Sequence, residues 1–306
     1  MTNVASGRRV RFESILLATD FSATSDRAFE IALALAARYG ATLHLVHVVN
    51  EEMAGEGAVP EVSESTYARL RDLAEDQLSV LAEDSEVGQV KAKTAALQGP
   101  LWPALEAYIR KEKVDLIVAG THGRKGWAHA VLGSGAEEIF RRATLPVLVV
   151  GPGRQKEGAP EMRTIVYATD LSPHAAPAAE YAASLAQEFE AKLVLLHAAP
   201  PHDLERIQGL ALAKSYVEAL QATVPAAAAT WAEVEYEIAA GDADEQVPAV
   251  AGKRGADLIV IGARRAGGLA LRLPSTAQRI IARAACPVLV IPSTAPETAR
   301  DVSAVA

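Results

Sequence analysis

The chain carries one sequence pattern twice, and this internal repeat limits the fold more than any other feature. The second copy follows the first at an offset of 150 residues in its first half, and the offset then falls to 142 and 141 residues. The matching segments are 14–20 (SILLATD) with 164–170 (TIVYATD), 43–47 with 193–197, 114–120 (VDLIVAG) with 256–262 (ADLIVIG), and 146–150 with 287–291. We therefore expect two domains, 1–152 and 161–295, joined by a linker rich in glycine, proline and charge.

Within each copy, short continuous apolar runs alternate with amphipathic stretches. Continuous runs are typical of strands that are buried on both faces. Residues 25–39 place alanine, leucine and isoleucine at spacings of three and four, which predicts a helix that Ser22 or Thr24 caps and Gly40 ends. Further helices are predicted over 67–81, 103–111 and 136–142. The alternation predicts an α/β fold of two tandem, five-stranded, parallel, doubly wound (Rossmann-like) domains.

The amino-acid composition limits which kinds of molecule and which cellular compartment suit this chain. The 306 residues include 30 Lys+Arg and 38 Asp+Glu, a formal charge of −8, which disfavours nonspecific binding to nucleic acid. The single cysteine, Cys286, excludes an intramolecular disulfide and a multi-cysteine metal site, and it fits a reducing compartment. No apolar stretch approaches 18 residues and the N-terminus has no signal-like core, so we expect a cytoplasmic protein without a membrane span.

A glycine-rich segment follows the fourth predicted strand, at the edge where doubly wound sheets bind ligands. It has the spacing G-x2-G-x9-G-S, formed by Gly120, Gly123, Gly133 and Ser134. Glycine allows backbone amides to approach an anion closely, and the following helix directs its N-terminus to the same place. Ser134 can donate a hydrogen bond and Arg124 can balance outer phosphates. The segment predicts a phosphate-binding loop.

The alternative is that glycines after strands simply form turns. The segment lacks the G-x4-G-K-[ST] pattern of P-loops and the G-x-G-x-x-G pattern of dinucleotide-binding folds. The long spacing, the serine and the strand–loop–helix context favour the phosphate-binding interpretation.

On these motifs the chain resembles the universal stress protein family in its tandem-domain form. The matching residues are 15–22 (ILLATDFS), 47–48 (HV), 120–123 (GTHG), 133–134 (GS) and 146–150 (PVLVV). The resemblance implies that G-x2-G-x9-G-S binds ATP, and Mg²⁺ stays open as a companion of the nucleotide. It also implies that the halves pair through their last strands, 146–150 and 287–291, as an internal pseudo-dimer. A homodimer of chains and an unknown protein partner stay open.

The resemblance also assigns roles to single residues. It implies that Asp20 lies beside the nucleoside and that Val48 offers backbone contacts to adenine. The residues implied to hold ribose and phosphates are Gly120, Gly123, Gly133 and Ser134, with Gly135 and Ala136 as backbone donors. For Asp20 the alternative is an acid that stabilises a helix N-terminus. His47, like His197, is interpreted as a core or rim histidine rather than a catalytic base.

The second copy departs from the loop. Arg265 stands where Gly123 would be expected and Pro274 where Gly133 would be, and the loop is one residue shorter. A side chain blocks close backbone approach and proline has no amide to donate. We expect the second domain not to bind ATP as the first does.

Three functions are weighed. The leading one is an ATP-binding stress-response or regulatory protein that is not an enzyme. The second is a slow ATPase or phosphotransferase, in which Asp20 holds Mg²⁺ and Arg124 stabilises charge, although no general base is apparent. The third is a dimerisation scaffold without nucleotide.

Overall fold

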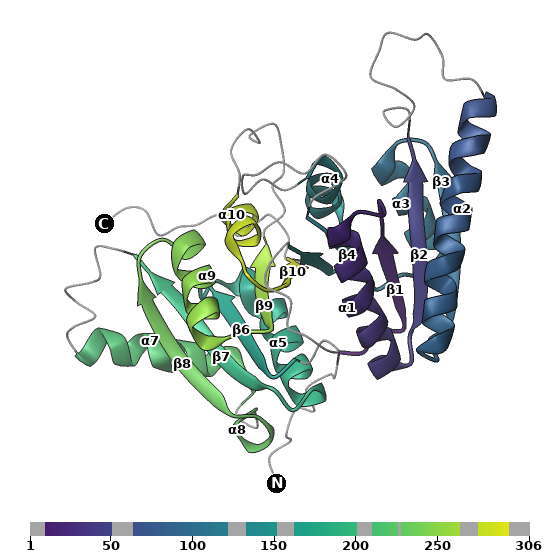
Figure 1. The fold of residues 1–306 in the computed structure, drawn as a ribbon. Coiled ribbons are helices and arrows are strands. Elements are labelled where there is room, and N and C mark those ends of the chain that lie inside the picture. Colours follow the sequence, from purple (N-terminus) through teal and green to yellow (C-terminus); the bar gives the residue numbers. More distant parts are fainter. Residues whose placement is uncertain are drawn as a thin grey trace.

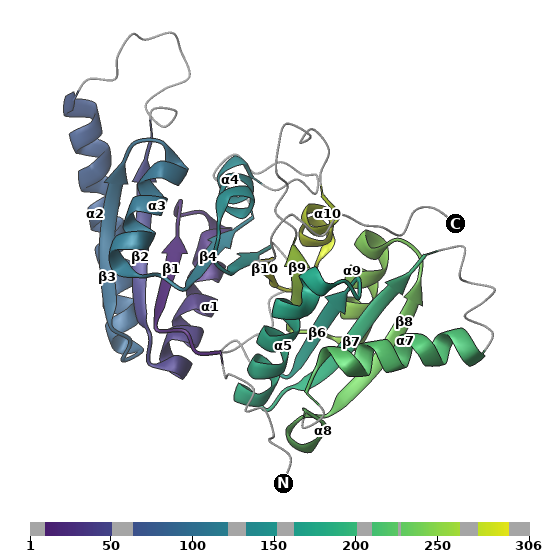
Figure 2. The same cartoon turned by 180° about the vertical axis from the view of Figure 1, so that it is seen from behind.

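The computed structural model describes residues 10–50, 64–121, 133–151, 162–200, 210–225, 228–263 and 275–293. Its ten strands form a single sheet in the order β3-β2-β1-β4-β5-β10-β9-β6-β7-β8 (Figures 1 and 2). Each half contributes five parallel strands with the doubly wound order 3-2-1-4-5. The predicted α/β fold with two tandem Rossmann-like halves is confirmed.

The elements follow the predicted alternation. The front half contains β1 Ser14–Ala18, α1 Ala23–Tyr39, β2 Thr42–Val49, α2 Glu64–Val87, β3 Ala92–Gln98, α3 Leu101–Glu112, β4 Leu116–Gly120, α4 Ser134–Arg142 and β5 Val147–Val150. The rear half contains β6 Thr164–Thr169, η2 Pro173–Ala175, α5 Ala176–Glu188, β7 Lys192–Ala199, α7 Leu210–Thr223, α8 Ala228–Trp231, β8 Val234–Ala240, α9 Ala243–Arg254, β9 Leu258–Ala263, α10 Thr276–Arg283 and β10 Val288–Pro292. Among the described residues, no helix is long and apolar enough to cross a bilayer.

The predicted ends of the first helix are confirmed. Ser22 is the N-cap of α1, and its Oγ accepts a hydrogen bond from the Ser25 amide at 3.3 Å. Gly40 ends the helix in the left-handed conformation with φ of 64°, which glycine adopts without steric cost. The other three predicted helices of the front half lie within α2, α3 and α4.

Helices cover both faces of the sheet and enclose two apolar cores. On one face α1, α2, α5, α7 and α8 contribute buried side chains, and on the other face α3, α4, α9 and α10 do so. Central strand residues such as Leu16, Leu17 and Val118 are fully buried. This explains why the strands read as continuous apolar runs.

The halves join through their last strands. β5 and β10 pair antiparallel, with Leu148 opposite Leu289 and Val149 opposite Val288. Each of these four side chains is at most 2% exposed. The pairing removes two apolar sheet edges from solvent, since an open edge of this kind would template association with other chains.

Further contacts across the halves connect the segment before β1, and α1, to α5. The Val10 amide donates to Ser184 Oγ at 2.7 Å, and Arg38 forms an ion pair with Glu188 at 2.8 Å. The ring of Phe12 lies 6.2 Å from that of Tyr181. The halves therefore share packing as well as strand pairing on this face of the sheet.

A polar cluster lies buried at the amino ends of the front strands. Ser14 donates its hydroxyl to the Glu112 carbonyl at 3.2 Å, so its oxygen accepts from His44 Nε2 at 3.1 Å. His44 Nδ1 is then left to accept from the Tyr108 hydroxyl at 3.0 Å. These bonds require a neutral imidazole. Burial accordingly lowers the pKa of His44 and raises the pKa of Tyr108 to about 12.

The two edge strands carry ion pairs of opposite polarity. At the front edge, Lys93 of β3 pairs with Glu112 of α3 at 2.5 Å. The equivalent positions in the second copy, 142 residues later, hold Glu235 of β8 and Arg254 of α9, which pair at 2.7 Å. The acid and the base have exchanged places between the copies.

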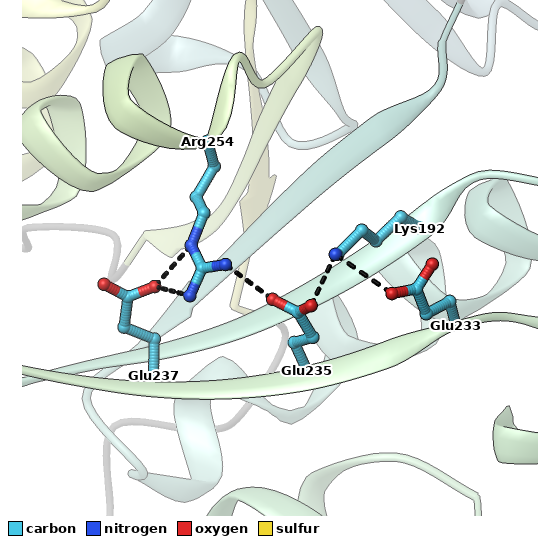
Figure 3. A network of polar contacts seen from close by, with 5 residues as sticks. All are labelled: Lys192, Glu233, Glu235, Glu237 and Arg254. Atoms are coloured by element: carbon cyan, nitrogen blue, oxygen red, sulfur yellow. Dashed lines mark hydrogen bonds and ion pairs between the residues drawn. The ribbon is translucent and has the colours of Figure 1, made fainter.

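The rear pair belongs to a longer network. Arg254 also contacts Glu237, and Lys192 contacts both Glu233 and Glu235, so the charges alternate along the edge (Figure 3). The Lys192 ammonium lowers the pKa of the Glu235 carboxyl by hydrogen bonding to it. Charged side chains on an edge strand oppose pairing with another sheet.

The junction generates a stability prediction. Leu289→Ala should lower the free energy of unfolding by about 2–5 kcal/mol, because it leaves a cavity opposite Leu148 where the halves meet. Urea denaturation followed by circular dichroism measures the change. The matched control is Leu73→Ala on α2, where the leucine is 61% exposed, and we expect a change within about 0.5 kcal/mol. Equal losses in the two variants would show that the junction is not a tightly packed part of the core.

The buried His44 predicts a dependence of stability on pH. Its pKa in the folded chain lies below that of the unfolded chain, so the unfolded state binds a proton first as pH falls. The stabilisation is complete above about pH 6.5 and is lost as pH falls from there toward the lower folded value. Thermal unfolding between pH 8 and pH 5 measures it.

His44→Gln is the comparison for this experiment. The variant should lack the part of the decline that His44 causes, while carboxylates titrate equally in both proteins. The difference between the two curves therefore isolates the histidine, and parallel curves would contradict the prediction.

Candidate functional site

The described ends of the glycine-rich loop meet at the carboxyl end of β4. The Thr121 amide donates to the Val150 carbonyl at 2.9 Å, and the Gly133 amide donates to the Thr121 carbonyl at 2.6 Å. Thr121 is buried. These two bonds fix the point at which the chain leaves β4 and enters α4. They bring the first and third glycines of the motif close together.

Gly120 is required by packing. A Cβ at this position would lie 2.9 Å from the carbonyl carbon of Thr24 and 3.0 Å from the amide nitrogen of Ser25. The first turn of α1 therefore packs directly against the end of β4. Gly133 has φ of −60°, so left-handed backbone does not explain that glycine. At Gly120 the glycine provides space, which brings the N-terminus of α1 to the edge of the sheet.

Asp20 lies in a tight turn between β1 and α1. Its Oδ1 accepts from the Ser25 hydroxyl at 2.6 Å and from the Ser22 amide at 3.1 Å. Phe21 between them has φ of 60°, an uncommon conformation for a non-glycine residue. The acid stabilises the turn that begins α1, as the alternative interpretation proposed. Ser25 also adjoins Gly120, so these contacts link Asp20 to the end of β4.

The two histidines at the ends of the second strands have the same structural role. His47 Nδ1 hydrogen-bonds to the Thr19 carbonyl at 2.8 Å, and its ring lies 4.7 Å from that of Phe21. His197 Nδ1 bonds to the Thr169 carbonyl at 2.9 Å. A carbonyl only accepts, so Nδ1 is the protonated nitrogen in both rings. Both rings are buried with Nδ1 bonded, which agrees with the interpretation of both as core or rim histidines.

The remaining predicted residues are placed as follows. Val48 is 7% exposed and pairs with Leu97 across β2 and β3, one strand further from the loop than β1. Gly135 and Ala136 lie in the first turn of α4, where a Cβ on Gly135 would approach the Leu101 side chain at 3.3 Å. Gly123 and Arg124 lie outside the described residues.

The helices that follow the two loops begin differently. In the front half the N-cap of α4 is Gly133, which has no side chain to cap the helix, and Ser134 is the exposed first helical residue. In the rear half the N-cap of α10 is Ser275, whose Oγ accepts from the Gln278 amide at 3.2 Å. Gln278 Oε1 in turn accepts from the Ser275 amide at 2.7 Å, which completes a capping box.

The sequence contains the signal for this capping box, but the sequence analysis did not predict it. Ser275 and Gln278 have the required S-x-x-Q spacing. The front half has the same signal in Ser134 and Glu137, yet there Glu137 pairs with Arg141 at 2.6 Å and accepts from Gln278 Nε2 at 3.2 Å. The sequence pattern alone does not show which half has the capping box. The aligned serine is the N-cap in α10 but the first helical residue in α4.

The described residues contain no group of three or more histidine, cysteine or acidic side chains arranged to hold a metal ion. The predicted Mg²⁺ ligand, Asp20, uses Oδ1 within its own turn. The described residues at the front edge include the N-terminus of α4 and the exposed Ser134, and a helix N-terminus with a nearby hydroxyl favours an anion.

The fold defines a class of protein: a duplicated, doubly wound α/β chain whose helix α4 begins at the carboxyl edge of the front half without a side-chain cap. The sequence profile of the Universal stress protein family matches residues 11–151 and 161–292. The chain therefore belongs to the universal stress protein family.

Similar proteins agree with this assignment. A universal stress protein of Methanocaldococcus jannaschii is 31% identical over 143 residues, which cover 45% of this chain and 82% of that protein. One from Thermus aquaticus is 34% identical over 142 residues, covering 45% and 98%. Over both halves, the crystal structure of a universal stress protein from Archaeoglobus fulgidus superposes with a TM-score of 0.71 at 22% identity, covering 92% of this chain and 98% of that one.

The close contact at Gly120 generates a prediction. Gly120→Ala should lower the free energy of unfolding by about 1–3 kcal/mol, because the added methyl group meets the backbone of α1 and forces it away from β4. Chemical denaturation measures the loss. Gly252→Ala on α9 is the control, since nothing lies within 4 Å of its Cβ position, and we expect it to be neutral or stabilising by up to about 1 kcal/mol. A Gly120→Ala protein as stable as the parent would refute the packing role.

Proposed function

We propose that the front half, residues 1–152, binds ATP at the carboxyl ends of β1 and β4. The phosphates would be held by Gly120, Gly123 and Gly133 together with Ser134 and the first amides of α4. Asp20 and Val48 would border the nucleoside, and Arg124 the outer phosphates.

The open N-terminus of α4 is the observation that supports this proposal most. Its N-cap is a glycine, its first residue is an exposed serine, and the loop returns to it through the bond between Gly133 and Thr121. Helix N-termini favour anions through their amide groups and dipole. Because Asp20 is engaged in its turn, we expect Mg²⁺ to arrive with the nucleotide phosphates rather than on a dedicated carboxylate site.

We propose further that the rear half, residues 161–295, does not bind ATP in this way. The Ser275 hydroxyl, which aligns with Ser134, is used to cap α10. Pro274 removes an amide from the segment before the helix. The same scaffold would thus hold a nucleotide in one half and not in the other.

The activity that follows is regulatory. ATP on α4 would act beside the contact from Glu137 to Gln278, which connects α4 to α10 of the rear half. Binding that fixes α4 therefore has a direct route to the other half, and a partner protein could read the nucleotide state from it. We propose a nucleotide-dependent stress-response protein rather than an enzyme.

The test is a matched pair of serine substitutions. Isothermal titration and native mass spectrometry should give one ATP per chain. Ser134→Asp should weaken ATP at least about tenfold, because its carboxylate would repel the phosphates. Ser275→Asp should leave binding unchanged, because aspartate is also a good N-cap and keeps the helix end intact.

Other outcomes separate the alternatives. Two ATP per chain would refute the asymmetry, and loss of ATP with Ser275→Asp but not with Ser134→Asp would move the site to the rear half. Absence of any nucleotide binding would leave the dimerisation scaffold. Steady release of inorganic phosphate that Ser134→Asp abolishes would establish an ATPase instead of a binding protein.

A further inference from the structure

A cavity of about 650 Å³ lies at the carboxyl edge of the rear half. Its size falls within the range of about 300–1,000 Å³ that is usual for small-molecule sites. It is bounded by the ends of β6, β7 and β9, by the starts of α9 and α10, and by part of the front half. Figures 1 and 2 both show α10 and α4 side by side above the junction of the sheets.

The front half supplies one wall of this cavity. Phe140 and Arg141 of α4 line it, together with Leu145 and Val147 at the start of β5. They reach it because β5 pairs with β10, whose Val290 also lines the cavity opposite Val147. A molecule inside would contact both halves of the chain.

The described wall is mainly apolar and electrically balanced. Its charged residues are Arg141 and Asp170, one of each sign. Arg141 is paired with Glu137 at 2.6 Å, and Asp170 Oδ1 accepts from the Ser172 amide at 2.9 Å. Among the described lining residues, a charged ligand would find no dedicated counter-charge to offset the hydration that it loses, which is unfavourable.

The helix end at the cavity is already satisfied within the chain. Ser275, Thr276 and Gln278 line the cavity, and the capping box uses the amides of Ser275 and Gln278. Phosphate recognition at a helix start depends on amides that point to the ligand. The rear helix therefore offers less to a phosphate than α4 does.

Among the described lining residues, His197 is a polar group whose orientation is fixed. His197 lines the cavity, and its ring is fixed by the Thr169 carbonyl at 2.9 Å and by stacking against Tyr216 at 4.7 Å between centroids. Since Nδ1 is used in that bond, Nε2 is the nitrogen with which His197 can bind a ligand. A mainly apolar lining with a few placed polar groups is the usual composition of a site for a small organic molecule.

We propose that this cavity is a second ligand site, distinct from the front nucleotide site, and that it takes an uncharged, largely apolar organic molecule without phosphate. The ligand bridges the two halves, with α4 on one side and α10 on the other. Its occupancy stabilises their present arrangement, because a molecule that binds only the folded form raises stability by mass action.

The experiment uses the full chain and the neutral dye 6-propionyl-2-(dimethylamino)naphthalene, whose emission moves to the blue in apolar surroundings. We expect one dye per chain, with a blue shift, both without ATP and with saturating ATP. The anionic dye 8-anilinonaphthalene-1-sulfonate should bind at least about tenfold more weakly, because the described part of the wall supplies no positive charge beyond Arg141, which is paired with Glu137.

Substitutions on α10 locate the dye. Ala277→Phe should weaken the neutral dye at least about tenfold by filling the cavity, whereas Ala282→Phe, on the same helix but away from the cavity wall, should not. Thr276→Trp fills the cavity from an exposed position and should act like Ala277→Phe even if that variant folds poorly. Phe140→Ala should also weaken the dye, because it removes part of the front wall.

The controls keep this result apart from the front site. ATP titration of each variant reports whether the front half is intact, so loss of dye with retained ATP binding supports the proposal. Absence of dye binding, displacement of the dye by ATP, or equal affinity in Ala277→Phe, Thr276→Trp and the parent would overturn it. Dye binding by the parent and its loss in the α10 variants are also measured without ATP, so these two outcomes do not depend on whether the front half binds ATP.

Discussion

The antiparallel pairing of β5 with β10 is the interaction on which the rest of the molecule depends. Each half has a five-stranded sheet that ends in an apolar strand. An apolar edge strand that is exposed to solvent promotes association with other chains. Pairing them gives one sheet whose two cores both contain residues from both halves. The pairing also places α4 beside α10. As a result, Glu137 contacts Gln278, and Phe140 forms part of the wall of the rear cavity.

Small differences at two equivalent helix ends separate the chemistry of the halves. A glycine before α4 leaves the helix open, while a serine before α10 folds back on the amide of Gln278. The backbone geometry of the sheet is the same in both places, down to the left-handed Phe21 and Leu171 with φ of 60° after each first strand. In a duplicated chain, two equivalent helix ends can thus differ in their caps while the scaffold and its packing persist.

Repetition and periodicity were sufficient to predict most of the fold. The strands, the helix between Ser22 and Gly40, and the joining of the last strands follow from local patterns and from the resemblance. The hydrogen bonds of Asp20 and the close packing of α1 against Gly120 could not be predicted, because they depend on how close a helix comes to a strand end. The shared wall of the rear cavity left no local signal, since it exists only once both halves are assembled.

The reversed ion pairs on the two edges bear on how a duplicated chain avoids assembling wrongly. Two similar copies can exchange equivalent strands during folding, and such exchange is a common failure of repeat proteins. If β8 took the place of β3, Glu235 would face Glu112, and the reciprocal move would set Lys93 against Arg254. Each mistaken arrangement brings like charges together, and this repulsion selects against it. The polarity of these pairs therefore favours the arrangement in which each outer strand pairs within its own half.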